Sequence, residues 1–534
     1  MLSTTAVFLA ILSSGVFAQN NDWTKPCLSG ECFYDLPQST GTSGTMRVWG
    51  ASEAISDITT AAGWTILDCD ANALSQNIRL VCTGADDDCN HLFSGAGAVH
   101  TLVRLPQNCG ASAFARVSRS WVHADQSIPA SVASQLRRKR QAAPVVQGLA
   151  VDTNFADADP VNGNVSIAIA GSNVPGQTGN LTVTPPPAPQ RRSRLQNRGL
   201  FSFIEDAFKK FNDFDDSVTK SLPPIDVDKQ FPVFSQSISC PSPAVSASVS
   251  VDVDAKAHAV ITLGMSAVGQ IIPPALSEFG VFAGLDASMS GTMTLKGSAT
   301  VGVPYWNIGS IDSGSVNVFQ TGIPGLDFPG ILTIGPTFSI NVQGTGNLDV
   351  QADATMVLSY NVQGAKLFFP HSDTQTSGGN FNPGDSPLSL SVQPSVSSKA
   401  VLGAHVIPRI DLGVSGLGGA ASATVSLSLD AAATMTMSLN GTASAAVNTK
   451  APAAASGSVG GCVDIGASLN VAASADGDFF GLFDKSTSVG FLYLVSSWIF
   501  SQNSLGEPVQ QELRSPQEVL QRRHWWNPPR ASGH

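Results

Sequence analysis

The chain has 534 residues, of which 13% are charged, and its formal net charge is −11 at pH 7. This negative balance argues against a nucleic-acid partner, because phosphates require a basic surface, and against attachment to anionic membranes by charge alone. The length allows roughly two to four domains.

Residues 1–18 predict a signal peptide. A short apolar segment, Ala6 to Leu12, precedes Val16-Phe17-Ala18, which places small residues at the −3 and −1 positions of a cleavage site after Ala18. The basic residue that usually precedes such a segment is missing, and the alternative is an ordinary buried N-terminal segment. We expect a mature, extracellular chain that begins at Gln19.

The cysteines agree with secretion, because all eight follow residue 18 and an even number suits an oxidising compartment. Zinc is the competing interpretation, but the chain has no CxxC pair. We expect pairing between cysteines that are neighbours in sequence, among the 15 arrangements that six cysteines allow. The expected disulfides are Cys27–Cys32, Cys69–Cys82, Cys89–Cys109 and, in the second half of the chain, Cys240–Cys462.

Residues 19–125 predict a small disulfide-rich α+β module. Ser52 is expected to cap a helix over residues 53–63, since Ile55, Ile58 and Ala62 recur at helical spacing. Strands are expected at 46–49, 65–67, 78–82, 100–105 and 115–122, and the core is expected to contain Trp49, Trp64 and Trp121.

Residues 126–199 predict a linker with processing signals. The run Arg137-Arg138-Lys139-Arg140 is a candidate cleavage site after Arg140, with a solvated charge cluster as the alternative. A short strand is expected at 165–170. Sequons predict glycosylation at Asn164 and Asn180, and at Asn440 further along the chain.

Residues 200–220 predict an amphipathic helix with one aromatic stripe. Such a stripe inserts into lipid in some proteins, but here nearby aspartates would repel anionic headgroups, so we favour docking against the following domain. The stripe consists of Phe201, Ile204, Phe208 and Phe211.

Residues 221–500 predict a domain of very long strands, because apolar residues alternate with polar ones over unusual lengths. Strands of this length reach roughly 60 Å at about 3.3 Å per residue. We expect an elongated antiparallel β-sandwich or flattened barrel, with small inward side chains that let two layers approach closely. The runs are 245–261, 285–303 and 421–439 with apolar odd positions, and 338–362 with apolar even positions.

No segment predicts a membrane span. The best apolar run, 489–500, contains two serines and is shorter than the ~20 residues that a helix needs. Residues 501–534 predict a polar disordered tail without a removable hydrophobic anchor.

A Pro- and Gly-rich sequence, residues 322–331, leads into Leu332-Thr333-Ile334-Gly335-Pro336, where Pro and Gly shape a tight connection before a strand. With its flanking long strands, this region resembles a β-rich domain of secreted filamentous-fungal proteins to which no activity is assigned. The N-terminal module resembles companions of that domain in mushroom-type fungi. The resemblance implies an extracellular location and transfers no catalytic residue.

Motifs for chemistry are sparse. The best carboxylate pairs for glycoside hydrolysis are Asp252 with Asp254 and Asp349 with Asp353, although acidic residues are routine on solvated strands. His258 lies on a polar strand face, where we expect a solvent-facing structural role. Asp86-Asp87-Asp88 lacks a full calcium-ligand set. We predict no catalytic residue, no metal ligand and no cofactor.

Three roles remain, in order of preference. The first is a non-catalytic extracellular or cell-wall-associated protein, with a cell-wall polysaccharide or another extracellular glycan as its partner. The second is a lipid-binding or membrane-perturbing β-protein, since long amphipathic strands also build membrane hairpins. The third is a polysaccharide hydrolase.

Overall fold

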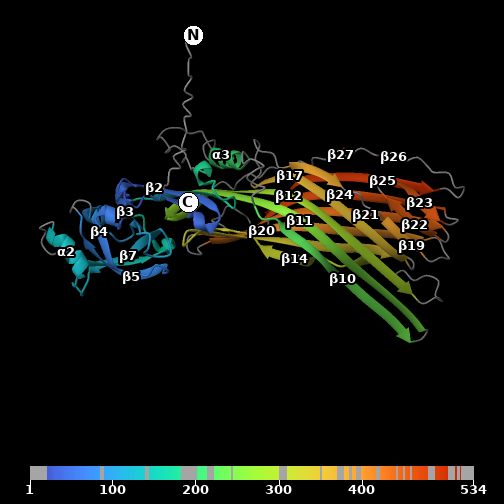
Figure 1. Cartoon of the computed structure of the whole chain (residues 1–534), viewed down its shortest axis with the longest axis horizontal. Helices are drawn as coiled ribbons and strands as arrows, with labels where there is room; N and C mark the ends of the chain where they lie inside the picture. Colours follow the sequence, from blue (N-terminus) through green and yellow to red (C-terminus); the bar gives the residue numbers. More distant parts are fainter. Residues whose placement is uncertain are drawn as a thin grey trace, which may run out of the picture. The chain divides into compact units, whose positions relative to one another are not determined.

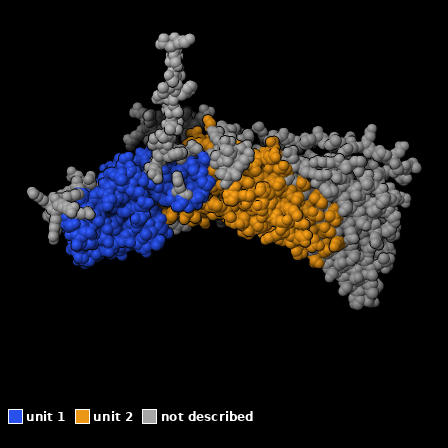
Figure 2. All heavy atoms as spheres, viewed as in Figure 1, with its two compact units in different colours: residues 1–171, 175–185, 270–273 blue, residues 172–174, 186–269, 274–534 orange. Residues whose placement is uncertain are grey.

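The computed structural model of this chain divides into two compact units, coloured separately in Figure 2. Unit 1 comprises residues 1–171, 175–185 and 270–273, and unit 2 comprises residues 172–174, 186–269 and 274–534. The structure describes residues 21–84, 89–138, 144–181, 201–212, 222–241, 244–299, 310–348, 352–369, 378–383, 388–392, 398–416, 421–440, 443–448, 451–456, 460–478, 487–502, 512–513 and 517–518.

Unit 1 contains a sheet of six described strands in the order β3-β6-β7-β8-β5-β4. The β3–β6 pair is parallel and the others are antiparallel. One face of the sheet buries a compact apolar core that includes Trp64, Leu80 and Leu149. The strands are β3 (Ile55–Asp57), β4 (Trp64–Asp68), β5 (Ser75–Cys82), β6 (Leu102–Arg104), β7 (Phe114–Val122) and β8 (Val146–Asp152).

Two elements of unit 1, one strand and one helix, lie in residues 126–199, which the sequence predicts as a linker. Strand β8 is inserted between β5 and β7, and helix α2 (Ala130–Arg138) precedes it. A third element of the segment, β9 (Val165–Ser172), confirms the short strand expected at 165–170 and pairs with β2 (Ser43–Gly50). Strand β2 in turn pairs antiparallel with β1 (Glu31–Asp35).

The helix predicted over residues 53–63 is wrong. The segment instead forms two short 3-10 helices with β3 between them, and Ile55 and Ile58 are both fully buried. The apolar residues at helical spacing belong to a strand and a turn packed into the core, so burial prevailed over local helical pattern. The 3-10 helices of unit 1 are η1 (Gln38–Thr40), η2 (Ser52–Ala54), η3 (Thr60–Ala62), η4 (His91–Phe93), η5 (Phe155–Asp157) and η6 (Thr178–Leu181).

Three disulfides close the module. Cys27–Cys32 is confirmed, but the other two predicted pairs are wrong, because the structure joins Cys69 to Cys109 and Cys82 to Cys89. In the β4–β5 hairpin Cys82 pairs with Trp64, whereas Cys69 follows the far end of β4. Five residues of strand separate the two cysteines by about 16 Å, well beyond the reach of a disulfide.

Unit 2 contains two sets of paired strands, seen in green to red in Figure 1. The first set runs β11-β12-β17-β19-β22-β23, with β10 beside β11 and β18 beside β17. Its strands are β10 (Ile225–Pro241), β11 (Ala244–Ile272), β12 (Pro274–Ala299), β17 (Ala352–Phe369), β18 (Gly378–Pro383), β19 (Leu388–Val392), β22 (Ala443–Asn448) and β23 (Ala451–Ser456).

The second set runs β13-β16-β20-β21-β24-β25-β26, with β14 and β15 beside β16 and β27 beside β25. Strands β26 and β27 lie in the predicted polar tail. The strands are β13 (Ser310–Asp312), β14 (Val316–Gly322), β15 (Leu326–Phe328), β16 (Leu332–Leu348), β20 (Ser398–Gly416), β21 (Ala421–Asn440), β24 (Gly460–Asp478), β25 (Thr487–Gln502), β26 (Glu512–Leu513) and β27 (Gln517–Glu518).

The long-stranded β architecture predicted for this part of the chain is confirmed, and so is its alternation. Odd residues of β11 are buried from Val253 to Ile261, and odd residues of β21 from Ala423 to Leu429. The two sheets approach closely where side chains are small. A Cβ atom on Gly291 of β12 would stand 3.6 Å from a methyl carbon of Val406 on β20.

One predicted strand is in fact two. The alternation over 338–362 is shared by β16 and β17, which belong to different sheets. Both strands keep even residues inside, as Phe338 and Val362 are each 1% exposed. Because the alternation continues from β16 into β17 without a break, the sequence does not reveal that the chain changes sheet between them.

The Pro- and Gly-rich sequence forms the β15–β16 hairpin, in which Leu326 pairs with Ile334. Gly330 has a positive φ of 74° in the turn, a conformation that favours glycine. A side chain on Gly325 would collide with the carbonyl oxygen of Ile334. The prediction of a tight connection before a strand is confirmed.

Helix α3 (Phe201–Asn212) docks on the first sheet, as the sequence predicts, through Phe208 and Phe211 of its aromatic stripe; the side chains of Phe201 and Ile204 lie outside the described set. Phe208 and Phe211 are each 1% exposed. Phe211 stacks on Phe282 of β12, with ring centroids 5.8 Å apart, and Phe208 lies 5.0 Å from Phe368 of β17. Gly264 of β11 leaves room for the Phe211 ring, which a Cβ atom there would overlap.

Several predictions lie outside the described residues or side chains. Residues 1–20, with the predicted cleavage site after Ala18, are outside them, and so is Arg140. The side chains of Asn180, Cys240, Asn440 and Cys462 are also outside the described set, so the Cys240–Cys462 pairing stays a prediction.

Candidate functional site

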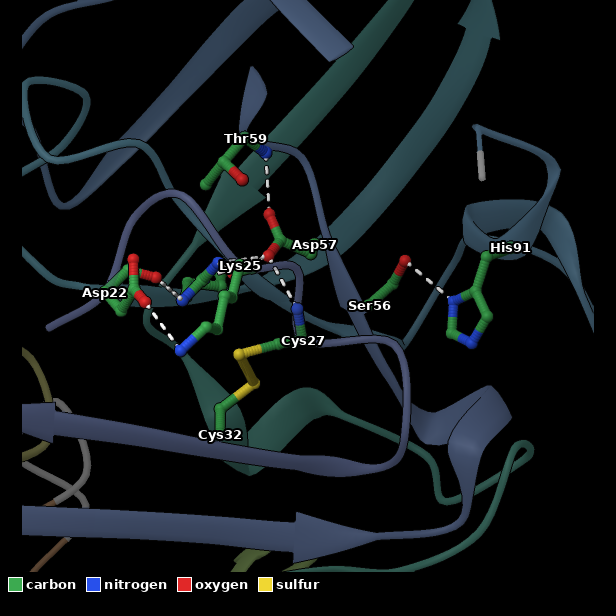
Figure 3. The surroundings of a disulfide bond; sticks show 9 residues. Asp22, Lys25, Cys27, Cys32, Ser56, Asp57, Thr59 and His91 are labelled. Carbon is green, nitrogen blue, oxygen red and sulfur yellow. Dashed lines mark hydrogen bonds and ion pairs between the residues drawn. A yellow bond between two sulfur atoms is a disulfide. The ribbon is translucent and has the colours of Figure 1, made fainter. Parts of the chain in front are cut away.

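The most buried charged group of unit 1 is an ion pair between Asp57 on β3 and Arg104 on β6. Figure 3 shows the surroundings of Asp57 beside the Cys27–Cys32 disulfide. These residues are register partners in the parallel pair. Asp57 Oδ2 accepts hydrogen bonds from Arg104 Nε at 2.9 Å and Nη2 at 2.6 Å. It also accepts one from the backbone N–H of Cys27 at 2.9 Å, while Oδ1 accepts from the N–H of Thr59 at 2.7 Å.

The same guanidinium holds the N-terminal segment in place. Arg104 donates to the carbonyl oxygens of Asp22 and Lys25, and it lies over the Trp23 ring at 5.1 Å from the ring centroid. Hydrogen bonds from Thr24 and Lys25 lower the pKa of Asp22 to about 2. The Asp57 and Arg104 side chains at the centre of this network are buried and fully hydrogen-bonded, so its role is to fasten the chain before the Cys27–Cys32 disulfide to the sheet.

A serine–histidine contact lies close by. Ser56 Oγ is 3.2 Å from His91 Nδ1, and the two side chains point toward one another in Figure 3. Ser56 is only 1% exposed, whereas a nucleophile must reach its substrate. The Ser56–His91 contact is therefore structural rather than catalytic.

Asp252 and Asp254, the first carboxylate pair considered for hydrolysis, lie on β11 in the β10–β11 hairpin. The hairpin carries a ladder of polar cross-strand pairs. In this ladder His258 Nδ1 is 2.6 Å from Asp226 Oδ1, and Lys256 Nζ is 3.3 Å from Asp228 Oδ2. Gln230 donates to Asp254 at 3.5 Å. Each pair consists of directly opposed residues, an arrangement that stabilises a hairpin. The solvent-facing role expected for His258 is confirmed.

Asp353, of the second predicted pair, lies on β17 opposite Lys296 of β12, and β12 separates β17 from β11. Asp349 lies outside the described residues.

A denser group crosses four strands of the second sheet. It comprises Asp312 on β13, Gln343 on β16, His405 on β20 and Asp430 on β21, and is called the polar row below. Gln343 Nε2 donates to Asp312 Oδ1 at 2.8 Å, and His405 Nδ1 lies 2.9 Å from Asp430 Oδ1. Gln343 and His405 are register partners.

The strand pattern places this row on the outer face. Residues 406, 410, 412 and 414 of β20 are buried apolar side chains, so the odd positions that alternate with them face outward. The His405 side chain is 24% exposed and that of Asp430 is 32% exposed. Half-buried polar groups of this kind are ordered by their neighbours yet remain open to a ligand.

The electrostatics of the row centre on the imidazole. The hydrogen bond with Asp430 raises the pKa of His405, and the charges of Asp430 and Asp312 act in the same direction against partial burial. Hydrogen bonds from Gln343 and from the N–H of Gly314 lower the pKa of Asp312, assisted by His405. The row thus presents two carboxylates, an amide and an imidazole whose pKa is raised.

A second polar cluster adjoins the row on the same face. Arg409 Nε donates to Asp411 Oδ1 at 2.6 Å, and its Nη2 donates to Ser426 Oγ at 2.8 Å. The Ser426 hydroxyl in turn donates to Asp411 Oδ1 at 2.5 Å. Arg409 remains 42% exposed, so this cluster extends the ordered polar surface along β20.

The sequence alone does not mark these residues as a site. His405 is one of eight histidines spread along the chain, and Asp430 is one polar position in a long alternation. A usable signal exists, because residues 405, 409 and 411 all occupy odd positions of one strand. Their proximity to β21 depends on strand order, which the sequence does not state.

The remaining candidates are spread through unit 1. Asn164 is exposed immediately before β9, which suits the predicted glycosylation. Trp64 is buried as expected, but Trp49 and Trp121 are only half-buried, so their assignment to the core is wrong. Each of these two tryptophans instead lies beside an arginine side chain, Arg47 and Arg119 respectively.

Comparison with known families adds one match. A family model described as a domain of unknown function (DUF7223) matches residues 284–479. The match begins within β12, ends just after β24 and includes the whole polar row. No curated protein and no solved structure matches the chain.

Among the described residues, no group of three or more His, Cys, Asp or Glu side chains is arranged to hold a metal ion. No helix in the same part of the chain is long and apolar enough to cross a membrane.

Proposed function

We propose that this chain is a secreted, non-catalytic extracellular protein that binds neutral glycan through the outer face of its long-stranded domain. The polar row carries the proposal. Sugar hydroxyls both donate and accept hydrogen bonds, and the row combines carboxylate acceptors with amide and imidazole groups. Gln343 and His405 contact the Oδ1 atoms of Asp312 and Asp430, not the Oδ2 atoms.

The proposed extracellular location is supported by features that do not involve the polar row. Three disulfides within one small module are typical of proteins that fold in an oxidising compartment. The predicted signal peptide and the exposed sequon at Asn164 agree with secretion and glycosylation. The resemblance to secreted filamentous-fungal proteins suggests a fungal source and cell-wall polysaccharide as the ligand, with wall association as the consequence.

The test is co-sedimentation of the full mature chain with insoluble chitin and β-glucan, alongside neutral and anionic liposomes. We expect retention on at least one polysaccharide and none on liposomes. Asp430→Asn should weaken retention severalfold, because one carboxylate that accepts from a hydroxyl is lost. Thr424→Ala is the matched control, since Thr424 is exposed on the same face of β21.

Sedimentation with liposomes instead would overturn the proposal in favour of lipid binding. Release of reducing sugars from the pellets would replace binding with hydrolysis. Equal retention of Asp430→Asn and Thr424→Ala would show that the polar row is not the binding surface.

A further inference from the structure

We propose that His405 is a proton switch that controls ligand access to the polar row; this inference rests on the proposed glycan binding and adds its regulation. When protonated, the imidazolium holds the Asp430 carboxylate through a charged contact and competes with an incoming hydroxyl. When neutral, it holds this carboxylate less tightly, and the carboxylate accepts a hydrogen bond from ligand.

The position of His405 between strands makes this competition direct. The neighbouring strand β21 presents Asp430, whose carboxylate contacts Nδ1 at 2.9 Å. On the other side β16 presents Gln343, which is neutral, and β13 beyond it presents Asp312. Along β20 the nearest outward positions are Gly403 and Ile407, which carry no charge.

The nearby cation Arg409 does not take the place of His405 as the positive partner of Asp430. Arg409 lies two outward positions along β20 and is engaged by Asp411 and Ser426. Within the described surroundings of the row, His405 is therefore the group that supplies positive charge to Asp430. Its pKa is raised because the hydrogen bond and the carboxylates favour the charged form, so the change of state falls above the ordinary value of about 6.5.

The sign of the effect follows from linkage. A ligand that binds the neutral form more tightly gains affinity as pH rises through the pKa of His405. The gain in affinity is limited by how far the bound ligand shifts the pKa of His405. A shift of one pKa unit corresponds to about a tenfold change in affinity. Glycan hydroxyls do not titrate in this range, so the pH dependence reports the protein.

The experiment uses the full mature chain and the polysaccharide that retains it, with binding isotherms between pH 5.5 and 8.5. We expect affinity to rise severalfold over this interval. His405→Gln keeps a hydrogen-bonding side chain without a titrating group and should bind equally at all these pH values. Thr424→Ala should retain the wild-type profile.

A second measurement needs no ligand. The NMR titration of the His405 ring, assigned by its loss in His405→Gln, should give a pKa above 6.5 that falls in Asp430→Asn. A raised pKa in a chain that no polysaccharide retains would overturn the proposed function while leaving the titration chemistry intact. Retention with a flat pH profile, or an unshifted His405 pKa, would overturn the switch.

Discussion

Asp57 and Arg104 lie opposite one another in the parallel pair β3–β6, and one oxygen of the carboxylate accepts from both the guanidinium and the backbone of Cys27. Both side chains are at most 5% exposed. The pair therefore links three segments that are distant in sequence: the N-terminal segment, β3 and β6. Its value to the fold comes from this linkage, since burial alone costs desolvation.

Arg104→Met should destabilise unit 1 strongly. Removing the guanidinium leaves the Asp57 carboxylate buried without its cation, a change that typically costs about 3–5 kcal/mol. Urea unfolding followed by tryptophan fluorescence measures the effect. Lys25→Met removes an exposed partner of Asp22 and should change little. Equal midpoints for the two variants would contradict the linking role of Arg104.

Gly148→Ala should destabilise the six-stranded sheet through Trp121. The Trp121 ring lies across Gly148, its cross-strand partner on β8, and a Cβ atom at Gly148 would overlap the ring. Overpacking of this kind typically costs about 1–3 kcal/mol. The same substitution in a Trp121→Ala background should cost much less, because the obstructing ring is gone. A double-mutant cycle with no coupling would refute this packing.

Much of the fold follows from the sequence because side-chain alternation reports directly on burial. The odd-position pattern of β11 and β21 predicts which side chains are inside. What alternation does not report is pairing between strands, and this is where the predictions fail. The 338–362 run hides a change of sheet, and the Cys69–Cys82 pairing ignores that an antiparallel hairpin carries the two cysteines to opposite ends.

The candidate site is harder to predict for the same reason. His405 and Asp430 are 25 residues apart, and each is an ordinary outward residue of its own strand. Only the pairing of β20 with β21 and of β16 with β20 brings them beside Gln343. The carboxylates that stand out in the sequence, Asp252 and Asp254, are neighbours on one strand of the β10–β11 hairpin.

Phe211→Ala should loosen helix α3 from the long-stranded domain. Loss of a buried phenylalanine typically costs about 3–5 kcal/mol, and here it also removes the stack on Phe282. Limited proteolysis should cut within α3 faster, and the unfolding midpoint should fall. Lys209→Ala is the control, because Lys209 is exposed on the same helix. Unchanged proteolysis of Phe211→Ala would contradict docking as the role of the stripe.

The stability of the long-stranded domain should depend on pH through His405. A raised folded-state pKa means that the protonated contact with Asp430 stabilises the fold fully below about pH 6.5, the ordinary value in an unfolded chain. The contribution is lost as pH rises through the folded-state pKa. Compared with wild type, Asp430→Asn should therefore be less stable at pH 5.5 and closer to wild type at pH 8.5. A stability difference that grows with pH would contradict this sign.

Cleavage after Arg140, which the sequence predicts, should leave unit 1 assembled. The disulfides of the module all join cysteines that precede Arg140, so no described disulfide would hold the two fragments together. Strand β8 follows the cleavage site, yet it lies between β5 and β7 with backbone pairing on both sides. Its side chains Val146, Leu149 and Val151 are at most 2% exposed.

The fragments should consequently co-elute from a sizing column and separate only in denaturant, with or without reductant. Cleavage by a dibasic-specific protease, followed by native and denaturing electrophoresis, tests this directly. The substitution Leu149→Asp places an unpaired charge in the core of unit 1 and should let the fragments part without denaturant. Dissociation of the cleaved wild-type chain in plain buffer would show that β8 does not hold the two halves together, and would turn the tetrabasic run into a point of separation between the module and the long-stranded domain.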